Sequence, residues 1–229
     1  MINDEKKNWE AAMSTGKYFG CNDKYAEDLI RRRGSEITDI SLSAVGAISG
    51  IHQGEYREGF FDVKEEGSTW KMLEIGCGYG LYAAHFAPYV DEYIGVDVSE
   101  TIVNIGNEAL EEAEIHNAKL HVVAGCDLSF IPNNTIDLVF TAAVFIHTPL
   151  EVTKRYLEQT YTKLKHGGKF LHHFNMCTLG KGLHKPVWHV FTEDELDEMF
   201  EGILLTRVDK FDNQHYAKKQ WMRYVYGVK

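Results

Sequence analysis

The sequence of 229 residues lacks the features that mark a membrane-embedded or exported protein. No apolar run approaches the ~18 residues that a membrane-spanning helix needs. The start of the chain, residues 1–7, is mostly polar and does not resemble a signal peptide. The four cysteines are scattered without a Cys-x-x-Cys pair, which is typical of free thiols in a reducing compartment. These absences predict a cytoplasmic protein.

Basic residues are also scarce. The 24 lysines and arginines are outnumbered by 34 aspartates and glutamates, which gives a net charge of −10. A protein that binds polymeric nucleic acid needs a basic surface to neutralise phosphates, and no long basic stripe is present. The 11 histidines include no pair at metal-ligand spacing with a supporting carboxylate. The sequence therefore favours a small-molecule partner, without nucleic acid, membrane or metal, and does not predict an oligomeric state.

What the sequence does contain is a glycine-rich turn after a short apolar segment. Residues 71–80 are Lys-Met-Leu-Glu-Ile-Gly-Cys-Gly-Tyr-Gly, with Gly76, Gly78 and Gly80 at alternate positions. Glycine tolerates positive φ angles and, without a Cβ atom, lets a ligand approach the backbone closely. The pattern is typical of a loop that binds a nucleotide cofactor.

A carboxylate follows at the expected distance. A second apolar segment, residues 93–98, contains Asp97 roughly 20 residues after Gly76, where an acid can accept hydrogen bonds from both hydroxyls of a ribose. The dinucleotide fingerprint would require a third glycine at position 81, which is leucine. An NAD-dependent reductase is therefore disfavoured.

Four motifs in order over residues 70–175 resemble those of the class I S-adenosylmethionine-dependent methyltransferases. The first is the glycine loop with Glu74, which is similar to the family's Glu-x-Gly-x-Gly-x-Gly. The second is the turn 125–128, and the third is the segment 136–149. The fourth is the segment 164–171, similar to the family's Leu-x-Pro-Gly-Gly turn, with histidine in place of the proline.

The resemblance implies an α/β fold with a doubly wound, Rossmann-like sheet of seven strands. It implies an N-terminal helical cap over residues 1–68, a core over 69–229, and S-adenosylmethionine as the cofactor. The family's motifs imply these cofactor-binding residues: Glu74, Gly76, Gly78, Gly80, Asp97, Val98, Cys126, Asp127, Leu128 and Thr141. The chain departs from the family at Ala124, where many relatives carry an acid, so Asp127 is expected to accept from the adenine amino group instead.

The hydrophobic pattern alternates between strands and helices, as a doubly wound sheet requires. Strands are predicted over 71–75, 93–97, 119–123, 137–141 and 168–174. Helices are predicted over 81–88, 100–115 and 150–164. A capping box at Thr192 predicts a short helix that ends at Phe200. An antiparallel pair over 203–208 and 221–228 is expected to close the sheet.

Ligands in open α/β sheets bind at the carboxyl ends of the strands. The reactive centre is therefore expected at the loop 141–149 and the segment 171–175, which contain His147, His172 and His173. A neutral imidazole can accept a proton, so a histidine here suits the base of an O-methylation. Because side chains alternate along a strand, only one of His172 and His173 can face the cleft. His173 is the first candidate base and His147 the second, although each position also suits a histidine that only anchors the loop.

Two residues are candidates for substrate binding. Tyr18 lies in a polar N-terminal stretch and is a candidate lid over the cofactor. Arg223 lies within the apolar stretch 221–226, where an unpaired guanidinium would cost free energy. Arg223 therefore needs either an acidic partner or an anionic group of the substrate.

The sequence thus predicts a methyltransferase that acts on a small molecule or a sugar-type metabolite, with O-methylation slightly favoured by the histidines. Two alternatives stay open. One is N-methylation of a small amine, phosphorylated or not, and the other is a partner protein that binds S-adenosylmethionine without transferring its methyl group. The residues that would select the acceptor carry no recognisable motif, so the acceptor itself is not predicted.

Overall fold

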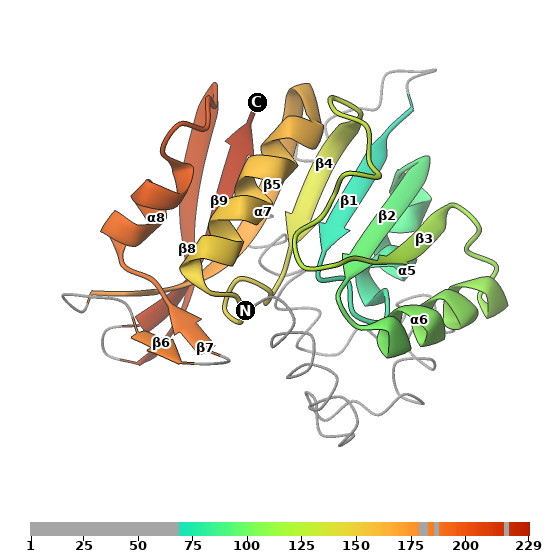
Figure 1. The fold of residues 1–229 in the computed structure, drawn as a ribbon, viewed down its shortest axis with the longest axis horizontal. Coiled ribbons are helices and arrows are strands. Elements are labelled where there is room, and N and C mark those ends of the chain that lie inside the picture. The colour runs from blue at the N-terminus through green and yellow to red at the C-terminus, as the bar shows by residue number, and fades with distance from the viewer. Residues whose placement is uncertain (1–68, 179–182, 186–187, 218–219) are drawn as a thin grey trace.

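The computed structural model describes residues 69–178, 183–185, 188–217 and 220–229 (Figure 1). The predicted helical cap over residues 1–68, and Tyr18 within it, lie outside the described residues. The boundary between cap and core therefore stays a prediction.

A single large sheet forms the centre of the described core. Its strands are β1 Lys71–Ile75, β2 Glu92–Asp97, β3 Ala118–Val122, β4 Ile136–Thr141, β5 Leu164–Cys177, β8 Arg207–Ala217 and β9 Gln220–Val228. They lie in the order β3-β2-β1-β4-β5-β9-β8, in which the first five strands are parallel and β9 is antiparallel to both of its neighbours. A separate hairpin pairs β6 Leu183–Lys185 with β7 Trp188–Val190.

Helices cover both faces of the sheet (Figure 1). The described helices are α5 Leu81–Phe86, the 3₁₀ helix η2 Ala87–Tyr89, α6 Glu100–Glu112, α7 Leu150–Lys163 and α8 Glu193–Phe200. α5 and α6 pack in one core with Met72 and Leu138, while α7 and α8 pack in a second core with Leu73 and Val139. Since successive residues of a strand point to opposite faces, strands with apolar residues on both faces are buried between the two helix layers. The predicted doubly wound α/β fold is confirmed.

The closing antiparallel pair differs from its prediction. Its second strand lies where expected, as β9, but its first strand is β8, which begins at Arg207 and continues to Ala217 instead of spanning 203–208. β8 is an edge strand and carries polar residues such as Asp212, which pairs with Arg223 on β9. The apolar alternation on which the prediction depended is therefore missing from most of β8.

Two further features were not predicted. β5 continues to Cys177, beyond the predicted end at residue 174, because it pairs with β9 as far as Gln220. The β6–β7 hairpin has strands of three residues each, which are too short to show a periodic pattern. Within the described part of the chain, no helix is long and apolar enough to cross a membrane.

The parallel pairing brings the carboxyl ends of several strands to one edge of the sheet. Ile75, the last residue of β1, lies opposite Val96 on β2 and Thr141 on β4. Thr141 in turn lies opposite His172 on β5. Figure 1 shows the arrowheads of β1 and β4 at this edge. The loops that follow these strands therefore meet there, and they build the candidate site.

Candidate functional site

The glycine loop turns sharply after β1. Gly76, Gly78 and Gly80 have φ angles of 68°, 53° and 77°, in the left-handed region that favours glycine. The amides of Gly76 and Cys77 both donate to the carbonyl oxygen of Val96, at 2.7 and 3.0 Å. These bonds fasten the loop to the end of β2.

The surroundings of the glycines differ. A Cβ atom at Gly76 would collide with the side chain of Val144, in the loop after β4. A Cβ atom at Gly78 would meet nothing within 4 Å in the described part of the chain. Among the described residues, the backbone of Gly78 therefore faces open space, as close approach of a ligand requires.

Asp97 lies beside Gly78 at the end of β2. One carboxylate oxygen accepts the amide of Gly78 and the other accepts the amide of Ser99, each at 3.0 Å. Burial raises the pKa of Asp97 above its ordinary value, while these hydrogen bonds oppose the rise. A carboxylate offers about four acceptor positions, so Asp97 can accept further hydroxyl groups after making these bonds. Val98 is partly buried at the same strand end.

Glu74 is buried in β1, just ahead of the loop, and accepts a hydrogen bond from the hydroxyl of Tyr93 on β2. Burial, with a smaller contribution from the Asp97 carboxylate, raises the pKa of Glu74 from 4.5 to about 8. The carboxyl group is therefore mostly protonated near pH 7. This geometry gives Glu74 a supporting role under the loop rather than a charge that faces a ligand.

Stability is expected to depend on pH through Glu74. Its pKa is higher in the folded chain than the ordinary 4.5, so between about pH 5 and pH 8 the folded state holds a proton that the unfolded state has released. The free energy of unfolding should therefore fall as the pH rises across this range. Glutamine resembles the protonated carboxyl group but does not titrate. We therefore expect the free energy of unfolding of Glu74→Gln to fall by about 3 kcal/mol less than that of the native chain across this pH range. Urea unfolding of both proteins at each end of the range measures it, and identical pH profiles would contradict the assignment.

The turn after β3, which the family resemblance places at the adenine, is held by α7. Gly125 has a φ angle of 63°, and its carbonyl oxygen accepts the hydroxyl of Tyr156 at 2.6 Å. The amide of Leu128 donates to the side chain of Gln159 at 2.9 Å. Cys126 and Leu128 are buried in this turn. The shape of the turn is therefore fixed by two residues of α7.

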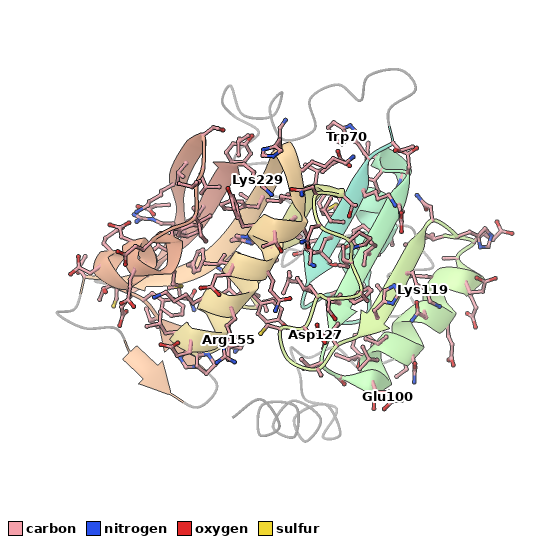
Figure 2. All side chains as sticks on the ribbon, turned by 45° about the horizontal axis from the view of Figure 1, so that its top comes forward. Trp70, Glu100, Lys119, Asp127, Arg155 and Lys229 are labelled. Carbon is pink, nitrogen blue, oxygen red and sulfur yellow. The ribbon has the colours of Figure 1, made fainter. Side chains whose placement is uncertain are left out.

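Asp127 is the exposed residue of the same turn (Figure 2). Its carboxylate accepts the amide of Ser129 at 2.9 Å, and hydrogen bonds from Ser129 lower the pKa of Asp127. An ionised, exposed carboxylate remains able to accept from a ligand. The sequence did not reveal Tyr156 and Gln159 as supports, because the buried Tyr156 has the spacing of an ordinary core residue on an amphipathic helix.

His172 and His173 point to opposite faces of the sheet, as the strand alternation predicted. His172 stacks on Phe170 with ring centroids 4.6 Å apart, in the core beneath α7, and its Nδ1 lies 3.2 Å from Oγ1 of Thr141. Burial lowers the pKa of His172 to about 3. His173 lies on the other face, where its Nδ1 accepts the amide of Ala143 at 3.0 Å. Burial, and then the proximity of His147, lowers the pKa of His173 to about 4.

This hydrogen bond is an argument against His173 as the base, although that role stays untested. A backbone amide can only donate, so Nδ1 of His173 must keep its lone pair for Ala143. The neutral ring then carries its proton on Nε2, which makes Nε2 a donor. A base would also be weakened by the lowered pKa. His147, partly exposed in the loop after β4, is the other candidate, and its amide donates to the carbonyl of Val144 at 2.8 Å.

Arg223 has acidic partners, which is the first of the two explanations that the sequence left open for it. Its guanidinium binds both carboxylate oxygens of Asp212, at 2.7 and 3.0 Å, and pairs with Glu193 at the start of α8. Burial of Arg223 is explained by these two carboxylates without a substrate anion. A substrate-binding role for Arg223 stays a prediction, which its burial no longer requires.

The fold and the site define the class of the protein. A glycine loop after β1 and a carboxylate at the end of β2, in a sheet whose antiparallel strand β9 lies between β5 and β8, are the features of the class I S-adenosylmethionine-dependent methyltransferases. Residues 72–168 match a family model described as a methyltransferase domain. The chain carries a methyltransferase domain of this class.

Two curated relatives each match less than half of this chain. The chain is 32% identical over 101 residues to the uncharacterised methyltransferase YcgJ of Bacillus subtilis, covering 44% of this chain and 39% of that protein. It is 30% identical over 114 residues to phosphoethanolamine N-methyltransferase 3 of Arabidopsis thaliana, covering 49% of this chain and 22% of that protein. The chain thus spans well under half of the length of these relatives.

The fold also resembles that of a solved structure with a different named activity. The [4+2]-cyclase SpnF superposes on the chain with a TM-score of 0.62 at 17% identity, covering 71% of this chain and 76% of the cyclase. Similarity at this level supports the α/β architecture alone. The reaction must therefore be argued from the site.

Proposed function

We propose that the chain binds S-adenosylmethionine at the carboxyl edge of the sheet and transfers its methyl group to a hydroxyl of a small molecule, such as a sugar-type metabolite. The observation that carries the proposal is the bare backbone of Gly78 beside the Asp97 carboxylate. Together they offer room for close approach of the cofactor and an acceptor for its ribose hydroxyls.

The other proposed cofactor contacts lie along the same edge. The loop 76–80 would surround the methionine portion, and Glu74 supports this loop from within the sheet. Val98 and the turn 126–128 would flank the adenine, and Thr141 would lie near the sulfonium at the end of β4. The proposal is supported by the parallel pairing, which brings the ends of these strands together.

Bound S-adenosylmethionine supplies a methyl group that its sulfonium charge already activates. The chain needs to align the acceptor, exclude water and remove the hydroxyl proton while the new carbon–oxygen bond forms and the carbon–sulfur bond breaks. His147 is the proposed acceptor of that proton. As a whole residue it is partly exposed in the loop after β4, although its Nε2 atom is buried, whereas His172 and His173 are buried residues with lowered pKa values.

Methylation of a small amine is the second candidate, and the similarity to a plant phosphoethanolamine N-methyltransferase favours it. A neutral amine attacks without losing a proton first, so this reaction would not need His147. A third candidate is binding without methyl transfer, since the same fold also serves a protein named as a cyclase.

Matched acceptors test the proposal on the full chain. The chain is incubated with methyl-labelled S-adenosylmethionine and pairs of alcohols and amines that share one carbon skeleton. We expect label in the alcohols, and we expect His147→Ala to lower kcat for them about a hundredfold. Label in the amines alone, with no effect of His147→Ala, would favour N-methylation. Cofactor binding without any transfer would favour the partner-protein alternative.

A further inference from the structure

Ala143, in the loop after β4, has an unusual backbone conformation. Its φ angle is 57°, in the left-handed region that residues with a Cβ atom seldom adopt. A residue persists in such a conformation only when surrounding contacts hold it there. One such contact is the hydrogen bond from the Ala143 amide to Nδ1 of His173, at 3.0 Å.

His173 is well suited to hold this amide. The residue is only 4% exposed, so water does not compete freely for Nδ1. Its backbone amide also lies 3.4 Å from Oγ1 of Thr141, the last residue of β4. Because burial lowers its pKa to about 4, the ring stays neutral and Nδ1 stays an acceptor throughout the neutral pH range.

The residue after Ala143 connects this hydrogen bond to the glycine loop. Val144 lies so close to Gly76 that a Cβ atom at Gly76 would collide with the valine side chain. The carbonyl of Val144 also accepts the amide of His147. The conformation of Ala143 therefore affects the wall of the glycine loop and the segment that carries the proposed base.

We infer that His173 is a positioning residue of the cofactor site: by accepting the Ala143 amide, it holds Val144 against Gly76 and gives the loop 76–80 the shape that binds S-adenosylmethionine. The inference rests on the proposed function for the identity of the ligand. It assigns no proton transfer to His173.

Two amide variants of similar polarity provide the test. His173→Asn places an amide oxygen near the position of Nδ1, whereas His173→Gln places its amide near Nε2 and leaves the Ala143 amide without this acceptor. Calorimetric titration of the full chain with S-adenosylhomocysteine near pH 7.5 gives each Kd. We expect His173→Gln to weaken binding about tenfold, as loss of one buried hydrogen bond would, and His173→Asn to stay within about threefold of the native value.

Two further measurements separate this role from general stability. Amide hydrogen exchange over residues 142–148 of the ligand-free chain should be faster in His173→Gln than in His173→Asn. Adding Ala143→Gly to His173→Gln should recover most of the lost affinity, because glycine adopts a positive φ angle without strain.

The outcomes distinguish the inference from the proposed function. If the native chain binds S-adenosylhomocysteine and both variants bind equally well or equally weakly, the inference is overturned and the proposed function stands. If the native chain does not bind S-adenosylhomocysteine, both the proposed function and the inference are overturned. Rescue by asparagine but not by glutamine supports both.

Discussion

Asp97→Asn is expected to weaken the binding of S-adenosylhomocysteine about a hundredfold. Asparagine keeps the shape of the side chain but replaces one oxygen by an NH₂ group, which would face the amide of Gly78 or of Ser99. The variant thus loses an acceptor for a ribose hydroxyl and gains a contact between two donors. Together these defects cost about 3 kcal/mol, which corresponds to the expected loss in Kd. Calorimetry on the full chain measures it.

Asp91→Asn is the matched control. Asp91 lies just before β2, at the opposite end of the strand from Asp97, and is exposed. Its carboxylate accepts the amide of Trp70 at 2.6 Å. This variant should bind within about threefold of the native chain, because it changes the same chemistry far from the proposed site. An undiminished affinity in Asp97→Asn would contradict the ribose assignment.

Gly78→Ala is expected to abolish measurable cofactor binding while the chain stays folded. The added methyl group meets nothing within 4 Å in the described residues, so it would occupy the space assigned to the ligand. The φ angle of 53° costs an alanine only about 1 kcal/mol. Circular dichroism and thermal unfolding report the fold, and calorimetry with S-adenosylhomocysteine reports binding.

Gly76→Ala separates loss of ligand space from loss of loop structure. Gly76 has a similar φ angle, but its Cβ atom would collide with Val144. This variant should therefore lower the free energy of unfolding by about 3 kcal/mol, clearly more than Gly78→Ala. If Gly78→Ala bound the cofactor as well as the native chain, the open space beside Asp97 would not be the cofactor site.

Sequence patterns predicted the strands that are buried on both faces. β1 and β4 consist mainly of apolar residues bounded by turns, and their predicted ranges differ from the observed ones by at most one residue at an end. β8 was misplaced because its polar side chains are satisfied by partners such as Arg223 on the neighbouring strand. An apolar periodicity in the sequence indicates which residues are buried. An edge strand held by ion pairs buries few apolar residues and therefore shows little of this periodicity.

The same distinction applies to the candidate site. The glycines and Asp97 were predicted because their structural demands are local: positive φ angles in one turn, and a carboxylate at the end of the next strand. His173 and Arg223 were assigned other roles because Ala143 and Glu193, with which they form hydrogen bonds, each lie 30 residues away along the chain. A residue type shows what chemistry is available, whereas its hydrogen-bond partners decide which chemistry is used.

The position of α7 has a consequence for how such a domain can evolve. The helix begins directly after the loop that carries His147, and it holds the turn after β3 through Tyr156 and Gln159. Substitutions that shift α7 would therefore disturb both ends of the proposed cofactor site together. The β6–β7 hairpin instead reaches that loop through the bond from the His189 amide to the Ile146 carbonyl. Substitutions in the hairpin would therefore reach the proposed base through one backbone hydrogen bond, whereas substitutions in α7 would also reach the turn proposed to hold the adenine.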